Sequence, residues 1–459
     1  MREENGGING QKELALRQFL SYLDLKEAIS IGNNLKDTIC FSSSGVPRFE
    51  KIGFISHKLS KTLMKRPQTA QITIFSPITK KNIPGETLAR FNDGSQAIST
   101  DGVQLFLNFD PVFSFLAFSR EFDVTTGNRI SKINMQIYNR TPRLLRSHVR
   151  KIYRKKDRPI LPPEEFIGSS NNSLILLIEN FLMSQGLARQ SQKETPIILS
   201  HDIDTIFCQD MGINYLLQIL DKYNIPATWF FVPFCRDYKL DSSIIDDLLS
   251  KEMELGLHGH SHDGLLDKIP TSQIIQRLKE SRNRMSDFGI NISVFRSPFM
   301  FRSRKIMKSL RETGFKTDSS YPDKNTLSLT KKQKGVEYNR PFIPLIDNEI
   351  NLNKPLLVEI PSCYPQDVQI FEDFNIQNND AFQYWKYKFD FVKDFRGVFI
   401  FHGHPRYLVD HSELYEKLIR YLRDQNTIFT SFCNVRELFL KRFFDDTLLN
   451  KISFNLKVH

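Results

Sequence analysis

The second half of the chain predicts an α/β protein whose strands are parallel. From residue 196 onward, apolar runs of strand length alternate with longer segments of helical periodicity. This alternation is typical of parallel strands joined by crossover helices, either in a barrel or in an open sheet. Acids, histidines or an arginine follow successive apolar runs, at the strand ends where such folds gather their functional groups. Residues 36–139 instead show short strand-like runs between turn clusters, which predicts a smaller mixed domain.

The composition is that of a globular protein with an unusual positive charge. Of the 459 residues, 40% are hydrophobic and 25% are charged, and the formal net charge is +11. The first residues carry acids and lack the apolar core of a signal peptide, and no apolar run approaches the ~20 residues of a membrane span. The five cysteines are scattered without a CxxC pair, which favours a reducing compartment over a disulfide framework or a thiolate zinc site. We therefore expect a cytoplasmic protein that could touch the inner face of a membrane.

Much of the positive charge lies in one stretch, residues 140–158. It holds nine Lys and Arg residues against one acid, with apolar residues between them, and predicts a basic amphipathic helix before a proline-containing linker. The simplest interpretation is a solvated helix between domains. Clustered positive charge also attracts anionic membrane surfaces and lipid-linked sugar diphosphates, whereas no recognisable nucleic-acid fold accompanies it. We expect an N-terminal domain over 1–139, this helix and linker over 140–195, and a catalytic domain over 196–445.

Polar residues that carry chemistry follow five of the predicted strands. Taken alone, each has an ordinary explanation, because an Asp after a strand usually caps a helix or turn and a lone His or Arg usually makes structural polar contacts. Their recurrence at the same end of successive strands favours a functional site. The residues are Asp202 and Asp204, His258 and His262, Arg296, Asp318, and His402 and His404.

The spacing of these residues predicts a metal-dependent hydrolase. His258 and His262 are four residues apart and can converge on one ion, with Asp204 as a third ligand. Catalytic zinc sites use three such ligands and leave one position for water, whose pKa the metal lowers. Asp202 shares a strand face with Asp204 and could take a proton from that water. Arg296 would keep the Asp202 carboxylate ionised, because a nearby cation favours the charged form, and a histidine from the last strand end would protonate the leaving group.

The ordered motifs resemble the polysaccharide deacetylases, the NodB-homology family of carbohydrate esterase family four. The resemblance covers residues 196–440 and includes an ATWFFVP strand after the first motif. It implies a distorted (β/α)7 barrel, one divalent ion such as Zn²⁺ or Co²⁺, and hydrolytic removal of an acetyl group from an N-acetylated sugar. The matching segments are HDID, HGHSH, RSP, GFKTDSSYP and FIFHGHP.

The resemblance also implies a role for each matching residue. Asp202 would be the base, and Asp204, His258 and His262 would bind the metal. The backbone N–H of Phe299 would help to hold the oxyanion. Asp318 would orient the acid histidine. The sequence leaves that histidine open: His402 ends the apolar run directly and is favoured, whereas His404 has the His-Pro pairing of some members.

The chain departs from the family pattern at three of these positions. Phe299 replaces a tyrosine that is common after R-x-P. Tyr321 stands near a frequent tryptophan and is a candidate substrate contact. Glycine takes the second place of the H-[ST]-x-x-H motif. His201 and His260 are expected to be structural or to support the ligands.

Two other interpretations remain open at this stage. The segment HGHSHDG resembles the metal-binding motif of the phosphoesterases of the polymerase-and-histidinol-phosphatase type. The barrel could also be an inactive, carbohydrate-binding member of its fold.

The segment LARFNDGSQAISTDGVQLFLNFDP is similar to part of a glutamine-amidotransferase-like domain, but it carries no nucleophile elbow or Cys/His pair, so we expect an accessory, non-catalytic domain. A cytoplasmic deacetylase would act on a precursor of an envelope or surface polysaccharide.

Overall fold

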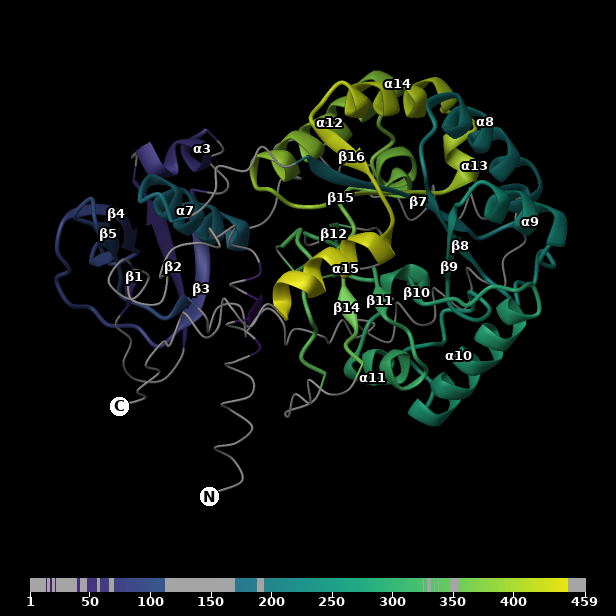
Figure 1. Ribbon diagram of the computed structural model, residues 1–459, viewed down its shortest axis with the longest axis horizontal. Helices are drawn as coiled ribbons and strands as arrows, with labels where there is room; N and C mark the ends of the chain where they lie inside the picture. Colours follow the sequence, from purple (N-terminus) through teal and green to yellow (C-terminus); the bar gives the residue numbers. More distant parts are fainter. Residues whose placement is uncertain are drawn as a thin grey trace.

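The computed structural model describes most of the predicted catalytic domain and part of the predicted N-terminal domain (Figure 1). The described residues are 48–55, 58–65, 70–111, 170–187, 194–324, 338–346 and 355–444, with short pieces at 14, 17–18, 21, 39–41, 326–327, 332–333 and 335–336. The basic stretch 140–158 lies outside them. Among the described residues, no helix combines the length and the apolarity that crossing a membrane requires.

A parallel sheet forms the core of the larger domain and confirms the predicted fold class. Its strands follow the order β14-β11-β10-β9-β8-β7-β15, and β16 also pairs with β7. Every pairing within it is parallel, and the sheet curls into a distorted (β/α) half-barrel (Figure 1). Its strands are β7 (Thr195–Ile203), β8 (Thr228–Phe231), β9 (Glu254–Leu257), β10 (Val294–Phe295), β11 (Thr317–Asp318), β14 (Val358–Glu359), β15 (Phe399–Gly403) and β16 (Thr427–Phe429).

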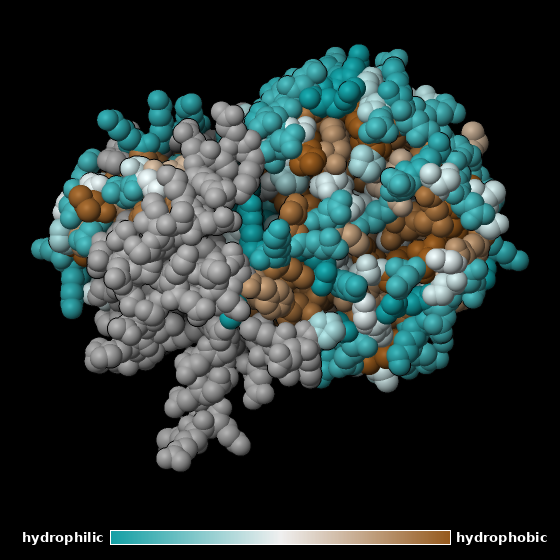
Figure 2. Space-filling view, viewed as in Figure 1, coloured by the Kyte–Doolittle hydropathy of each residue, from teal (hydrophilic) through white to brown (hydrophobic). Residues whose placement is uncertain are grey.

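The strands are apolar on both faces because the sheet is covered on both. All nine residues of β7 are buried or nearly so, and β15 is buried throughout, as expected of strands inside a parallel sheet. Amphipathic helices cover the outside (Figure 1), and hydrophilic side chains gather over the outer helices in Figure 2. These helices are α8 (Ile213–Tyr223), α9 (Ser242–Ser250), α10 (Thr271–Ser286), α11 (Arg304–Glu312), α12 (Asn378–Asp394), α13 (Pro405–Leu408), α14 (Ser412–Arg423) and α15 (Phe432–Phe443).

Side-chain caps begin three of these helices. Asp241 accepts a hydrogen bond from the backbone N–H of Ser243 before α9, and Ser303 and Ser431 cap α11 and α15 in the same way. Such caps satisfy backbone donors that the first helical turn leaves without partners. Short turns complete the domain: Cys208–Gly212, Pro298–Met300 and Gln369–Asp373, and the hairpin of β12 (Thr326–Leu327) with β13 (Lys332–Gln333).

The two edges of the curled sheet meet beside β15. The backbone N–H of Cys363, a few residues after β14, donates to the carbonyl of Ile400 at 3.3 Å. The N–H of Ile400 in turn donates to the Cys363 sulfur at 3.4 Å. These two contacts join the edges where no regular ladder pairs β14 with β15 in the described part of the sheet. The strand ends therefore surround a common centre.

The smaller domain is a mostly antiparallel sheet with the order β1-β6-β5-β4-β2-β3. Only the β1–β6 pairing is parallel. Gly94, with a φ of +85°, forms the turn between β4 and β5, a backbone conformation that favours glycine. The strands are β1 (Ile39–Phe41), β2 (Arg48–Phe54), β3 (Gln71–Ser76), β4 (Glu86–Phe91), β5 (Gln96–Thr100) and β6 (Leu105–Leu107), and the short helical pieces are Lys58–Ser60 and α3 (Lys61–Met64).

Helix α7 (Ser170–Ser184) connects the two sheets and lies within the segment predicted as helix and linker. It contacts β3 on one side. On the other, the buried Glu179 carboxylate lies 3.0 Å from Arg396 Nη1 and 3.5 Å from Arg340 Nη2. Because charges buried this deeply must be paired, this cluster fixes α7 to the barrel.

Candidate active site

The C-terminal strand ends of the barrel bring most of the predicted site residues together. β7 contributes Asp202 and is followed by Asp204, and the loop after β9 contributes two histidines. Parallel strands place such residues at the same end of the barrel. The residues that meet there are Asp202, Asp204, His258, His262, Arg296, His402 and His404.

Asp204, His258 and His262 form a group suited to a divalent cation. Their ligand atoms all lie within 4.8 Å of one another, and Asp204 Oδ1 is 3.4 Å from Nε2 of each histidine. This buried oxygen receives no hydrogen bond from the residues that the structure describes. The carbonyl of Arg296 lies 3.0 Å from His258 Nδ1, so Nδ1 donates there and the Nε2 lone pair faces the group, as is usual for metal-binding histidines. One carboxylate with two imidazoles is also a typical donor set for catalytic zinc, so these residues fit the predicted ion.

The loop that carries the two histidines requires glycine at its second position. Gly259 has a φ of +71°, and a Cβ at this residue would lie 2.6 Å from Pro298 Cγ. The proline of the R-S-P motif therefore occupies the space that a Ser or Thr side chain would need. His262 itself has a φ of +49°, which is a strained conformation for a non-glycine residue.

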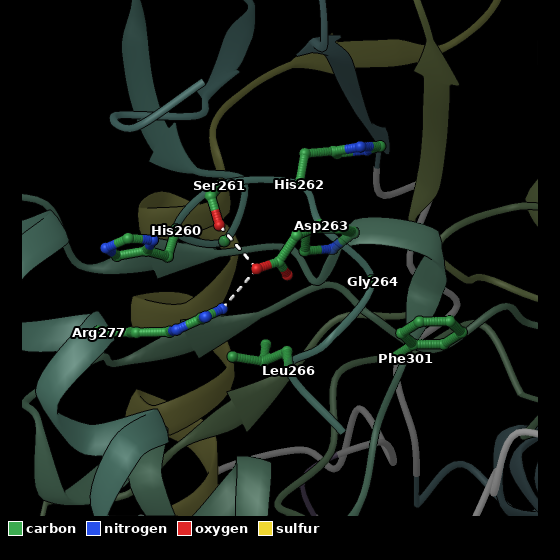
Figure 3. A pocket seen from close by; sticks show the side chains of 10 residues that line it. His260, Ser261, His262, Asp263, Gly264, Leu266, Arg277 and Phe301 are labelled. Atoms are coloured by element: carbon green, nitrogen blue, oxygen red, sulfur yellow. Dashed lines mark hydrogen bonds and ion pairs between the residues drawn. The ribbon is translucent and has the colours of Figure 1, made fainter. Parts of the chain in front are cut away.

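Asp263 holds this loop against α10. Its Oδ2 accepts hydrogen bonds from Ser261 Oγ at 3.0 Å and from Arg277 Nη1 at 2.8 Å (Figure 3). Its Oδ1 accepts from the backbone N–H of Leu265 at 2.9 Å. These contacts stabilise the strained residue beside it. His260 points to α10 as well, where its Nε2 lies 3.3 Å from Glu280.

Asp202 lies at the centre of the site and is ionised. Its Oδ1 accepts from Arg296 Nη1 at 2.9 Å, and its Oδ2 lies 2.7 Å from His402 Nε2. Burial by itself would raise the pKa of Asp202, but His258, His402 and Arg296 together hold that pKa well below its usual value. Arg296 is fully buried, with its guanidinium 4.2 Å from the ring centre of Phe230. The arginine therefore fixes both the charge and the orientation of the carboxylate.

His402 and His404 differ in their protonation. Burial, together with the Arg296 charge, lowers the pKa of His402 to about 4. Burial also opposes the charged form of His404, but the charge and hydrogen bond of Asp367 outweigh it and raise the pKa of His404 to about 9. His402, the sequence-favoured acid, is thus the neutral histidine at neutral pH. His404 is the one that carries a proton to donate.

Asp367, rather than Asp318, orients this histidine. Asp367 Oδ1 lies 2.8 Å from His404 Nδ1, and its Oδ2 accepts from the backbone N–H of the same residue. Asp318 instead accepts from Ser320 Oγ at 2.5 Å. The sequence analysis did not identify Asp367, because the segment PSCYPQ separates it from the apolar run LLVEI and it does not stand directly at a strand end.

Asp318 faces a second buried acid, Glu359, across the β11–β14 pairing. Burial and the Asp318 charge raise the pKa of Glu359 well above its usual value, and burial raises that of Asp318. Two adjacent carboxyl groups in such a place cannot both ionise and share a proton instead. Glu359 Oε1 also accepts the backbone N–H of Tyr321 at 3.1 Å. The pair supports the strand ends below the site.

The two predicted substrate contacts differ in position. The Phe299 ring lies 4.6 Å from the His262 ring, and Phe299 and Met300 have φ values of +59° and +55°, a strain that is common at functional sites. Tyr321, in contrast, is 1% exposed. Its ring lies under the Arg302 guanidinium at 4.2 Å. The substrate role expected for Tyr321 is therefore wrong, because this side chain belongs to the core.

Comparison with known proteins agrees with the motifs. Residues 190–317 match the model of the family described as polysaccharide deacetylase, which confirms the predicted resemblance over this stretch. No curated protein sequence matches the chain.

Solved structures described as members of this class are similar to part of this chain at low sequence identity. A protein of Mycobacterium smegmatis assigned to the polysaccharide deacetylases is 16% identical, with 56% of this chain and 93% of that chain covered and a TM-score of 0.47. A family 4 carbohydrate esterase from Streptomyces lividans in complex with acetate is 10% identical, with coverage of 52% and 93% and a TM-score of 0.34. A family 4 pseudoenzyme from Bacillus anthracis is 13% identical, with coverage of 53% and 66% and a TM-score of 0.36.

Proposed function

We propose that this protein is a metal-dependent hydrolase that removes the N-acetyl group from an N-acetylated sugar or glycan precursor. One observation carries the proposal: a three-residue ligand group lies directly beside an ionised carboxylate. Asp202 Oδ2 is 3.5 Å from Nε2 of His258, and His258 belongs to the ligand group. The match of residues 190–317 to the polysaccharide deacetylases supports the reaction class.

Asp202 is the base in this proposal. A divalent cation held by Asp204, His258 and His262 would lower the pKa of a nearby water and polarise the amide carbonyl. Asp202 accepts the proton of that water as its oxygen adds to the carbonyl carbon. Arg296 keeps the carboxylate charged and turned toward the site. The backbone N–H of Phe299 faces the developing oxyanion in this proposal, as preorganised donors do in acyl transfer.

His404 is the acid in this proposal. Its Nδ1 is held by Asp367, and its Nε2 lies 3.7 Å from Asp204 Oδ2, on the same side of the site as the ligand group. As the C–N bond breaks, Nε2 transfers its proton to the leaving amine nitrogen. The products are acetate and the free amino sugar.

The test is acetate release from a panel of N-acetylated substrates, with metal analysis of the purified protein. The panel contains nucleotide-linked and lipid-linked sugars and short oligosaccharides. We expect release that a chelator abolishes and that added Zn²⁺ or Co²⁺ restores, and we expect Asp202→Asn to retain metal without turnover. Metal-loaded protein that releases no acetate yet binds the glycans would instead support an inactive carbohydrate-binding role.

A further inference from the structure

A second group of possible ligands lies beside the first. Asp202, His402 and His404 also place one ligand atom each within 4.8 Å of one another, and all three residues are buried. The group has the same composition as the first, one carboxylate and two imidazoles. Its residues come from β7 and from the end of β15, whereas both histidines of the first group come from the loop after β9.

The carboxylate of each group also faces a histidine of the other group. Asp204 Oδ1 faces His258 and His262 at 3.4 Å, whereas its Oδ2 faces His404 Nε2 at 3.7 Å. Asp202 Oδ2 likewise lies between two imidazoles, 2.7 Å from His402 Nε2 and 3.5 Å from His258 Nε2. A carboxylate whose two oxygens face separate sets of histidines can bridge two cations, which in two-metal sites lie about 3.5–4 Å apart.

His404 has the outer contacts of a metal ligand. A ligating histidine commonly gives its second ring N–H to a carboxylate or a backbone carbonyl, which fixes the ring and makes the other nitrogen more basic. His258 does so with the Arg296 carbonyl at 3.0 Å, and His404 does so with Asp367 at 2.8 Å. In both residues Nε2 is left facing the centre of the site.

We propose that the site binds a second divalent cation through Asp202, His402 and His404, with Asp204 as the bridge. The Arg296 guanidinium already contacts Asp202 Oδ1 at 2.9 Å, and its charge repels a nearby cation, as does the first ion. The second cation must also displace a proton from His404 Nε2, because a ligating imidazole nitrogen is deprotonated. It therefore binds more weakly than the first. Because it occupies the base and the acid of the proposed function, it also blocks turnover.

The test is metal stoichiometry, which does not depend on any activity. Equilibrium dialysis of the apo protein against Zn²⁺, and titration with Co²⁺ followed by visible absorption, should give two equivalents, the second weaker than the first. Saturation of the parent protein at one equivalent in both measurements would overturn the proposal, and this result needs no variant that folds.

Variants then locate the second ion. His404→Ala and His402→Ala should each retain one equivalent, and Asp367→Asn should weaken the second equivalent while sparing the first. His411→Ala, which changes a histidine outside both groups, should still bind two. A second equivalent that persists unchanged in both His402→Ala and His404→Ala would place it elsewhere and contradict the assignment. Absence of acetate release on every substrate would count against the proposed function only, because the stoichiometry is measured without substrate.

Discussion

The Asp367 carboxylate holds His404 at two points, the ring nitrogen Nδ1 and the backbone N–H. Asp367 is fully buried, and the two residues are 37 positions apart in the chain. A contact of this kind fixes both the ring orientation and the nitrogen that carries the proton. In the proposed function, the proton donor is thus positioned by a residue outside the family motifs that identified the rest.

Replacing Asp367 should reduce turnover without emptying the first metal site. We expect Asp367→Asn to lower kcat about 10–100-fold, the usual cost of losing such a supporting partner, with little change in KM. The metal content of the Asp204 group should stay at one equivalent, which separates loss of positioning from loss of fold. A variant with parental kcat would show that Asp367 has no part in the reaction.

Substitution of a metal ligand and substitution of the base should have different effects on metal binding. His262→Ala should lose the tightly bound ion and acetate release together, because a zinc site of this type depends on all three protein ligands. Asp202→Asn should keep that ion and lose turnover. His260→Ala is the matched control from the same loop, since its Nε2 contacts Glu280, and it should retain the ion. Metal binding by the Asp204→Ala variant that equals the parent would refute the ligand assignment.

Excess metal should inhibit acetate release. With the apo protein titrated by Zn²⁺, the rate should rise up to one equivalent and then fall as the second cation reaches Asp202 and His404. The fall should be absent in measurements on a commercial zinc hydrolase under the same conditions, which controls for inhibition of the assay itself. A rate that keeps rising through the second equivalent would contradict the blocking role and favour a two-metal mechanism.

The sequence predicts those site residues that directly follow an apolar run. Asp202, His258, Arg296 and His402 all stand at such ends, and parallel pairing brings them together regardless of their separation in the chain. The contacts that it did not predict depend on side chains meeting across loops. Asp367 lies several residues beyond its apolar run and outside the motifs. The position of Asp318 opposite Glu359 depends on a β11–β14 register that spans 41 residues.

The segment of helix α7 illustrates a second limit of the sequence. It was expected to be part of a linker because a basic stretch and prolines precede it. Residues 172–179 of the helix are all buried, which is typical of a helix enclosed between two structures. The charged residue that fixes it, Glu179, is paired with Arg340 and Arg396, which are distant in sequence. The role of the helix therefore emerges only from the packing of the two sheets.

The close approach of Gly259 to Pro298 predicts a specific sensitivity. Gly259→Ala should lower the free energy of unfolding by about 1–3 kcal/mol through overpacking, in addition to backbone strain, and should weaken metal binding. Gly289→Ala is the matched control, because Gly289 has a similar φ of +75° but nothing within 4 Å of its Cβ position. Urea unfolding of both variants measures the difference. Equal losses in the two variants would show that the contact with Pro298 is unimportant.

The buried acid pair below the site predicts a pH-dependent gain of stability in Glu359→Gln. The raised pKa means that native Glu359 keeps a proton that the unfolded chain loses above about pH 4.5. Because the native state then binds more protons, the stability of the parent falls as the pH rises through the folded pKa. A glutamine amide can still accept the Tyr321 N–H and can donate to Asp318 without any proton to lose. The Glu359→Gln variant should therefore be more stable than the parent at about pH 8. The difference in the free energy of unfolding should shrink toward about pH 4. Urea unfolding across this range checks the prediction, with the exposed Glu437→Gln as control, and a Glu359→Gln difference that does not vary with pH would contradict the shared proton.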